Sequence, residues 1–386
     1  MNGEEKKKDK RKTIKIIILI ALCVTLATTI VCYIVNENIR HYIDYNLLGK
    51  VTTENNTKVI ELSDDNTTFV YAYDKYISIL NNNVLSIYNS SAKKSAELGI
   101  AVTNPIFESN NKYLVIAEKG GKKVFCVSGK NLAWQSDVDG EISRLNVNRN
   151  GYVTVIVSQT TYKTVVIAFN PNGKELFKTY LSDFYAIDSD ISNDNKYLAI
   201  ADVNTSGTAV QSNIRILSLE KLEIDTENAI IYNQDSEINQ LVAGIKYDDA
   251  GNLVVMYDTG VSIIKEGQEK KILTFSADTL FANIELNKEI VEIKKTQRED
   301  LMTETKTNII NTVGNKQLGY TIDAIPKEIQ VKRHTVAINT GMEAYFIDNN
   351  SWLKKKYNSN QEIKEVVLGD SIAGIVYKNK VNIIRI

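Results

Sequence analysis

The chain has 386 residues, of which 43% are hydrophobic and 24% charged, so it can form one large globular domain or two ordinary ones. The formal net charge is −1, but the first 15 residues carry seven Lys or Arg against three Asp or Glu, which leaves a charge of −5 on the rest. A phosphate-binding domain needs a concentrated basic face, so we expect no nucleic-acid partner.

The strongest local signal is the uncharged stretch Ile16–Val35. As a helix it would span about 30 Å, the thickness of the hydrocarbon core of a bilayer. Basic residues crowd its N-terminal edge, from Lys6 to Lys15, and the other edge, Asn36–Asn38, has no such cluster. The positive-inside rule therefore predicts a cytoplasmic tail (1–15), a transmembrane helix (16–35) and an extracytoplasmic remainder. We interpret the tail as a topology signal rather than as a site for nucleic acid or anionic lipid.

The alternative for this stretch is a cleaved signal peptide, which has a shorter apolar run and small residues before its cleavage site. Here the run is longer and ends in the bulky residues Val31–Val35. Neither Cys23 nor Cys32 follows the small residue expected before a lipidated cysteine. The sequence therefore favours a retained single-pass anchor.

Within the anchor, Ala21, Thr25 and Thr29 form a ridge of small residues that would support a weak helix-mediated dimer. The hydroxyls of Thr25, Thr28 and Thr29 are expected to bond to carbonyls one turn back. After the anchor, apolar residues recur at helical spacing at Ile39, Tyr42, Ile43 and Leu47. We therefore predict a juxtamembrane helix or stalk over 36–50.

From about Thr57 the helical periodicity ends, and short apolar strands alternate with turns rich in Asn, Asp, Gly and Ser. One unit recurs eight times: a turn, a strongly apolar strand, a tight link, a second apolar strand, another turn and a weaker amphipathic strand. The first strands are Tyr76–Leu80, Tyr113–Ala117, Tyr152–Val157, Tyr197–Ala201, Leu253–Tyr257, Ile290–Ile293, Val336–Ile338 and Ile372–Val376. Their partners are Val84–Tyr88, Val124–Val127, Val165–Phe169, Ile214–Leu217, Val261–Ile264, Thr307–Ile310, Ala344–Ile347 and Val381–Ile384.

The copies are spaced by about 36 to 56 residues, as propeller blades are. The sequence thus predicts an all-β fold, a β-propeller of about eight four-stranded blades over 57–386. Seven blades are the alternative, because Gln297–Lys306 is the least regular segment. The last copy ends after its third strand, and a spare strand, Lys58–Leu62, precedes the first copy. We expect the two to pair and close the ring, which removes both free sheet edges.

The chain resembles a Firmicutes (clostridial) family of single-pass, membrane-anchored β-propellers of unknown function. The resemblance rests on Asn104–Phe107, Ala117–Lys122, Asn150–Tyr152, Phe169–Lys174 and Ser192–Ala199. It implies fold and topology and no activity. More distantly, the chain is similar to WD-like and quinoprotein-like propellers. Ser128–Trp134 resembles the Gly…Trp signature of the latter, but the motif is essentially confined to one blade, so a quinone cofactor is not supported.

Catalytic signatures are absent from the sequence. Its two histidines, His41 and His334, are isolated, and no nucleophile elbow, Walker loop or dinucleotide fingerprint occurs. Only Cys126 lies beyond the apolar stretch, so that region has neither a disulfide nor a cysteine zinc site, which favours a bacterial surface. The acidic residues Asp188, Asp190 and Asp194 with Asn195 could supply calcium ligands, but we interpret them as a blade turn. We assign no catalytic, cofactor-binding or metal residues.

Three functions fit these features. The first is a non-catalytic binding or scaffold module for cell-envelope proteins, held on the outer face of a bacterial cytoplasmic membrane. The second is a receptor for a small molecule or cell-wall polysaccharide, which predicts aromatic and polar side chains converging on the central channel. The third is a glycan-active enzyme, which requires a polar pocket with carboxylates whose pKa values differ widely. We favour the first, a protein that is not an enzyme.

Overall fold

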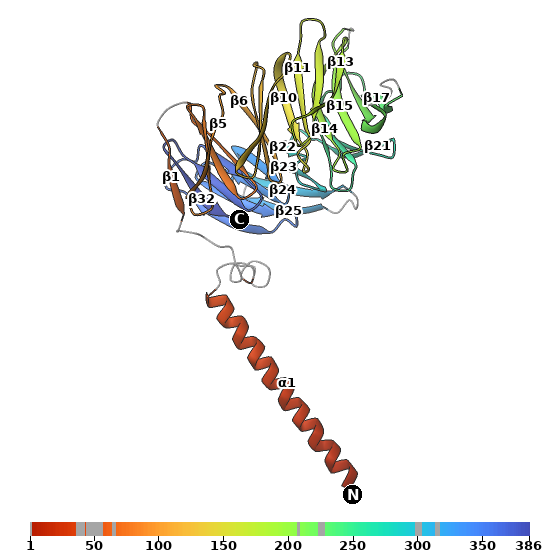
Figure 1. The fold of residues 1–386 in the computed structure, drawn as a ribbon. Coiled ribbons are helices and arrows are strands. Elements are labelled where there is room, and N and C mark those ends of the chain that lie inside the picture. Colours follow the sequence, from red (N-terminus) through yellow and green to blue (C-terminus); the bar gives the residue numbers. More distant parts are fainter. Residues whose placement is uncertain are drawn as a thin grey trace.

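The structure is a computed structural model that describes residues 2–35, 43, 57–63, 67–206, 209–222, 228–297, 303–312 and 317–386. It contains a long N-terminal helix, α1 (Asn2–Val35), and an eight-bladed β-propeller (Figure 1). The prediction of eight four-stranded blades is confirmed. Of the predicted stalk over 36–50 only Ile43 is described, so the expectations for Ile39, His41, Tyr42 and Leu47 lie outside the described residues.

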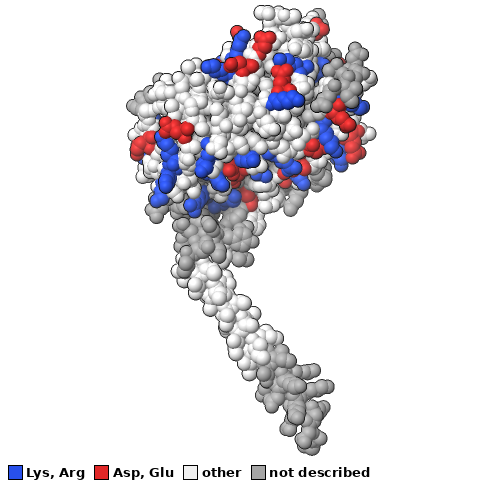
Figure 2. All heavy atoms as spheres, in the orientation of Figure 1, with Lys and Arg blue, Asp and Glu red and all other residues white. Residues whose placement is uncertain are grey.

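Within α1, the segment Lys15–Ile34 is long and apolar enough to cross a membrane, a test that a signal sequence also passes. Beyond Lys15 its described surface carries no charge (Figure 2). The threonine hydroxyls bond to carbonyls one turn back, as predicted: Thr25 to Leu22 at 2.9 Å and Thr29 to Thr25 at 2.8 Å. Thr28 likewise donates to Val24 at 2.9 Å, so all three threonine hydroxyls of this segment are satisfied.

Each blade is a meander of four antiparallel strands, numbered here from the innermost strand outward. Blade 1 is β2 (Phe69–Tyr73), β3 (Tyr76–Asn81), β4 (Val84–Tyr88) and β5 (Lys94–Gly99), and blade 2 is β6 (Pro105–Asn110), β7 (Tyr113–Glu118), β8 (Lys123–Ser128) and β9 (Asn131–Asp137). Blade 3 is β10 (Glu141–Val147), β11 (Val153–Ser158), β12 (Thr164–Phe169) and β13 (Glu175–Leu181). Blade 4 is β14 (Phe184–Ile191), β15 (Tyr197–Asn204), β16 (Gln211–Ser218) and β17 (Ile230–Asp235), with a one-turn helix, α3 (Leu219–Leu222), after β16.

The second half of the ring repeats this plan. Blade 5 is β18 (Val242–Tyr247), β19 (Leu253–Tyr257), β20 (Gly260–Lys265) and β21 (Gln268–Thr274), and blade 6 is β22 (Thr279–Asn283), β23 (Glu289–Gln297), β24 (Thr303–Asn311) and β25 (Gln317–Ile322). Blade 7 is β26 (Glu328–Lys332), β27 (Thr335–Asn339), β28 (Glu343–Asp348) and β29 (Leu353–Asn358). Blade 8 is β30 (Glu365–Leu368), β31 (Ile372–Val376), β32 (Lys380–Arg385) and, as its outer strand, β1 (Lys58–Glu61).

The ring closes as the sequence predicts, because β1 pairs antiparallel with β32 (Figure 1). In this register Lys58 faces Ile383 and Glu61 faces Lys380. Ile60 is 6% exposed and packs into the core between blades 8 and 1, whereas Val59 is 43% exposed. The first and last segments of the propeller therefore share one sheet and one core.

Eight apolar clusters hold the blades together, one in each interface between neighbouring blades. The predicted apolar strands are the two middle strands of each blade, and burial on both sheet faces explains their continuous apolar sequence. The cluster between blades 2 and 3 includes Trp134, which stacks on Phe169 at 5.4 Å and lies over Gly173. Trp134 is thus a packing residue between blades.

The strand directions define two faces of the ring. We call the face at which β1 begins and β32 ends the tether face; it carries the turns that follow each innermost strand. The opposite, distal face carries the loops that precede each innermost strand. The predicted Asn/Asp/Gly turns adopt positive φ at Gly151, Gly173, Asn195 and Gly251, all on the tether face.

Candidate functional site: the central channel

The innermost strands gather around a central channel, and every blade contributes one prominent polar side chain to it. In blade order, with Glu285 just after β22, these are Tyr71, Glu108, Arg144, Asp188, Lys246, Glu285, Lys332 and Glu365. From blade 2 to blade 8 the sign of the charge alternates without exception. Only blade 1, with Tyr71, breaks the alternation.

Local backbone irregularity aims some of these side chains. A β-bulge precedes Arg144 in β10 and Asp188 in β14, where the register against the next strand shifts. Bulges turn a strand edge and re-aim the next side chain. Gly244 on β18 leaves room for the carboxylate, because a Cβ there would lie 3.3 Å from Asp188 Oδ2.

Asp188 ties three blades together. It accepts two hydrogen bonds from Arg144 of blade 3, at 2.7 and 3.2 Å, and a third from the backbone N–H of Ile245 in blade 5, at 2.9 Å. Asp190 on the same strand accepts from the backbone N–H of Tyr247 at 2.8 Å. Both carboxylates are almost fully buried. They satisfy backbone donors on the free edge of β18, which is a structural role.

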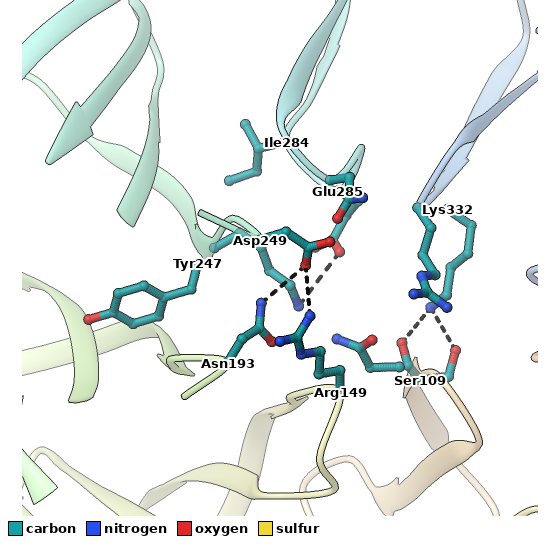
Figure 3. Close-up of a pocket in the computed structure, with 12 residues that line it drawn as sticks. Ser109, Arg149, Asn193, Tyr247, Asp249, Ile284, Glu285 and Lys332 are labelled. Carbon is teal, nitrogen blue, oxygen red and sulfur yellow. Dashed lines mark hydrogen bonds and ion pairs between the residues drawn. The ribbon is translucent and has the colours of Figure 1, made fainter. Parts of the chain in front are cut away.

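Two lysines bridge the channel toward the tether face. Lys246 of blade 5 lies 3.6 Å from Glu285 and donates to Asn146 of blade 3 at 3.2 Å. Lys332 of blade 7 donates to the hydroxyl of Ser109 in blade 2 at 2.8 Å and also to the Ser109 carbonyl (Figure 3). The bonds to Asn146 and Ser109 join blades that are not neighbours, so they cross the channel and narrow it.

A small cavity of about 50 Å³ lies at this tether end. Its rim includes Arg149, Asn193 and Asp249, which come from turns of three consecutive blades (Figure 3). The Arg149 guanidinium lies 3.6 Å from Asp249, and Asn193 donates to the same carboxylate at 3.4 Å. The tether end is therefore a network of mutually satisfied polar groups.

A second cavity, of about 160 Å³, lies deeper in the channel and is lined by residues of blades 6, 7, 8, 1 and 2. Its walls include Tyr71, Glu108, Gln330, Lys332 and Glu365. Among the described residues, neither Glu108 nor Glu365 has a hydrogen-bond or ion-pair partner for its carboxylate. We call this space the acidic cavity.

Burial separates the pKa values of these carboxyls. It raises the pKa of Glu108 to about 7, with repulsion from Glu285 adding to the effect, and it raises the pKa of Glu365 to about 7, with repulsion from Glu328. Burial also acts on Glu285, but attraction from Lys246 and Lys332 outweighs it and holds the pKa below its usual range. The carboxyl with an ammonium partner thus titrates low, and those without one titrate near neutrality.

The acidic cavity opens toward the distal face. A space of about 400 Å³ shares Tyr71 and Glu365 with it and is also lined by three aromatic residues and two lysines: Phe69, Phe107, Tyr377, Lys364 and Lys378. The Tyr71 ring stacks on Phe107, with ring centroids 5.2 Å apart and planes inclined by 15°. We call this space the aromatic vestibule.

The structure shows where the acidic residues and the histidine singled out in the sequence lie. Asp188 and Asp190 lie in strand β14, so the prediction of a blade turn is wrong for these two; the turn is the next segment, where Ser192 bonds to Asp194 at 2.6 Å. His334 lies in the turn between β26 and β27, as expected. Within the described ranges no group of three His, Cys, Asp or Glu side chains is arranged to hold a metal ion.

The eight channel side chains could not be recognised as a set in the sequence. They lie on the innermost strands, which precede the strongly apolar strands and have a weaker pattern. The available signal was a charged residue shortly before the turn that ends most of these strands, as with Lys246 before Asp248 and Glu108 before Asn111. That signal becomes specific only when the eight copies are aligned as blades.

Comparison with known proteins agrees with this architecture. Residues 47–386 match DUF5711, a family of unknown function. The chain belongs to this family. The predicted family of unknown function is thereby confirmed at this level, whereas its clostridial origin and its membrane anchoring stay predictions. No curated protein matches the chain by sequence.

Solved structures with the same fold include three propellers. The C-terminal WD40 domain of Sif2 has a TM-score of 0.58 at 11% identity and covers 87% of this chain and 99% of its own. BamB from Moraxella catarrhalis has a TM-score of 0.52 at 10% identity, covering 87% and 100%. The dihydro-heme d1 dehydrogenase NirN, in complex with DHE, has a TM-score of 0.51 at 9% identity, covering 88% and 74%. At these identities the likeness is one of fold alone.

Proposed function

We propose that this protein is a non-catalytic binding module, anchored by residues 16–35 on the outer face of a bacterial cytoplasmic membrane, that docks a cell-envelope protein on its distal face. One observation carries the proposal. Of the exposed large apolar side chains in the described part of the propeller, most lie on the distal face. They are Tyr180, Tyr185, Val210, Ile238, Leu241, Leu280, Ile325 and Met342.

These residues come from blades 3 to 7 and form what we call the apolar arc. Ile238 is 69% exposed, in the loop before β18, and Tyr185 is 44% exposed at the start of β14. On monomeric proteins, groups of exposed apolar side chains commonly mark interaction sites. The charges seen in Figure 2 are mixed in sign, which favours an apolar contact over an electrostatic one. Because β1 begins on the tether face, the chain enters the propeller away from the arc.

The test is proximity labelling in cells that carry the full chain, with the double variant Tyr185→Ser/Ile238→Ser. We expect loss of a reproducibly labelled envelope protein. The control is Ile230→Ser/Ile231→Ser, which removes two side chains of similar exposure from the outer strand β17. Equal labelling by all three forms would contradict the proposal. Protease added to whole cells tests the topology, because it should cut after Asn36 and spare the tail.

The second candidate function is a receptor for a small molecule. The observation that favours it is the convergence of polar and aromatic side chains on the channel, which this hypothesis predicts. The acidic cavity, at about 160 Å³, suits a small molecule rather than a polysaccharide chain. A thermal-shift screen of small molecules on the full chain in detergent tests it.

The glycan-active enzyme is the weakest of the three. Glu108 and Glu285 line one cavity and differ in pKa, as such a site requires. However, Glu285 is paired with Lys246, and the cavity is too small to place a glycosidic bond with a sugar on each side. We therefore propose no reaction.

A further inference from the structure

We propose that the acidic cavity binds a small organic cation, an amine or ammonium group that enters from the aromatic vestibule. The inference rests on the second candidate function, and it names the chemical class of the ligand and the place where it binds. The same group could be part of a free metabolite or the side chain of a lysine in a bound peptide. The chemistry is shared, and the experiment separates the two sources.

The alternation of charges around the channel is broken at blade 1. From blade 2 to blade 8, each channel charge has a neighbour of opposite sign on either side, except at the ends of the series. The ends are Glu108 and Glu365, and blade 1 lies between them with Tyr71. A positive charge beside Tyr71 would continue the alternation around the whole ring.

The cations of the innermost strands are committed elsewhere. Arg144 donates two hydrogen bonds to Asp188, and Lys246 forms an ion pair with Glu285. The ammonium of Lys332 lies close enough to line the acidic cavity, but it donates to the hydroxyl and carbonyl of Ser109. Lys364, which precedes Glu365 in the sequence and lines the vestibule, attracts this carboxylate without forming an ion pair with it. Among the described residues, Glu108 and Glu365 thus lack a counter-charge in contact.

Glu108 and Glu365 are half-buried, and a carboxylate in such a place is stabilised when it gains a cation in contact. The two carboxylates without a partner would therefore stabilise a bound cation, and they would not stabilise a neutral or anionic ligand. Glu285, on the same wall, adds negative potential although it is paired. The walls of the acidic cavity carry three carboxyl groups against the single ammonium of Lys332, and this balance favours a positively charged ligand.

Aromatic side chains surround the entry to the acidic cavity. Tyr71, Phe107, Phe69 and Tyr377 line the vestibule, and Tyr71 also borders the acidic cavity. An aromatic ring beside carboxylates attracts an organic ammonium through its π face and also packs against attached methylene groups. The hydrated metal ions that prefer all-oxygen cages gain nothing from such walls. The site geometry thus points to an organic cation with a short apolar stem.

The experiment is isothermal titration of the full chain in detergent at pH 8 and low salt. The probes are n-butylamine, tetramethylammonium and the peptide acetyl-Ala-Lys-Ala-amide; n-butanol and butyrate are the neutral and anionic counterparts. We expect saturable binding of at least one cationic probe, weakened about tenfold or more by Glu108→Gln and by Glu365→Gln. Asp249→Asn removes a negative charge at the tether end and should leave affinity unchanged.

Binding of the amines alone would assign a free metabolite, and binding of the peptide alone would assign a lysine of a partner; both support the cation. Equal binding of butanol or butyrate would overturn the cation assignment and leave the receptor function standing. Weakening by Asp249→Asn equal to that by Glu108→Gln would overturn the site. If no cationic probe binds while the small-molecule screen yields another ligand, the inference fails alone. If neither experiment finds a ligand, the receptor function fails with it.

Discussion

The two halves of the central channel are built differently. In blades 3 to 6 every innermost strand carries a β-bulge, and the channel charges form ion pairs between neighbouring blades. In blades 7, 8, 1 and 2 the innermost strands pair without a register shift, and Glu108 and Glu365 have no partner in contact. We call these the paired half and the seam half, since the latter contains the junction of the chain's two ends.

This difference separates structural charges from available ones. In the paired half, a bulge bends the strand and redirects its side chains, so that a carboxylate lies against a neighbouring cation and backbone donors. In the seam half, the innermost strands border a cavity, and burial raises the pKa of Glu108 and Glu365 to about 7. Only the second kind of charge can change its state or gain a partner without breaking the fold.

The largest expected effect is from Asp188→Ala in the paired half. It leaves the backbone N–H of Ile245 unsatisfied and Arg144 without its partner, so we expect a loss of about 3–5 kcal/mol in the free energy of unfolding. Thermal unfolding of the full chain in detergent measures it. Asp249→Ala breaks a more exposed pair, with a distance of 3.6 Å, and should cost less than about 1 kcal/mol. Similar losses for both would show that the paired half does not depend on these bonds.

The next effect comes from the seam itself. Ile60→Ala removes a buried side chain from the core between blades 8 and 1, and we expect a loss of about 2–4 kcal/mol. Val59→Ala, on the next residue of the same strand, removes a side chain that is 43% exposed and should change stability by less than about 0.5 kcal/mol. If the two variants unfold at the same temperature, β1 does not close the ring as a packed strand.

Much of the architecture could be predicted because the middle strands of a blade are buried on both faces. Their continuous apolar sequence, as in Val153–Ser158 and Thr164–Phe169, is a direct consequence of that burial. The turns could be predicted equally well, because a positive φ favours residues such as Gly151 and Asn195. The closing strand could be inferred by counting, since the last copy lacked one strand and the first had one to spare.

The channel could not be predicted in the same way. Its residues are far apart in the sequence, and what pairs them is the position of each blade in the ring: Lys332 meets Ser109 although 223 positions separate them. Asp188 and Asp190 stood out as acidic residues, but their environment, between Arg144 and the free edge of β18, exists only in the closed ring. A single sequence shows the charge of such a residue and not whether its partner is present.

The smallest predicted effect tests the comparison most directly, because it concerns two carboxyls on one cavity wall. The pKa of Glu108 is raised to about 7, first by burial and then by Glu285, while Lys246, Lys332 and Arg144 act in the opposite direction. The unfolded chain releases this proton near pH 4.5, so between pH 4.5 and about 7 the folded state holds a proton that the unfolded state has lost. Stability therefore falls as pH rises through this window. Glu108→Gln should remove the loss and stabilise the protein by about 1–2 kcal/mol at pH 8, with no effect at pH 4.

Glu285→Gln should act with the opposite sign. The pKa of Glu285 lies below its usual value because Lys246 and Lys332 outweigh the effect of burial, so its charge stabilises the folded state above pH 4.5 and this contribution is lost as pH falls. The variant should therefore unfold at a lower temperature than the parent at pH 8, and the difference should shrink in acid. Thermal unfolding of both variants from pH 4 to pH 8 measures the two trends together. Two trends of the same sign would mean that Glu108 has a counter-charge after all, and the seam half would then be paired like the rest of the ring.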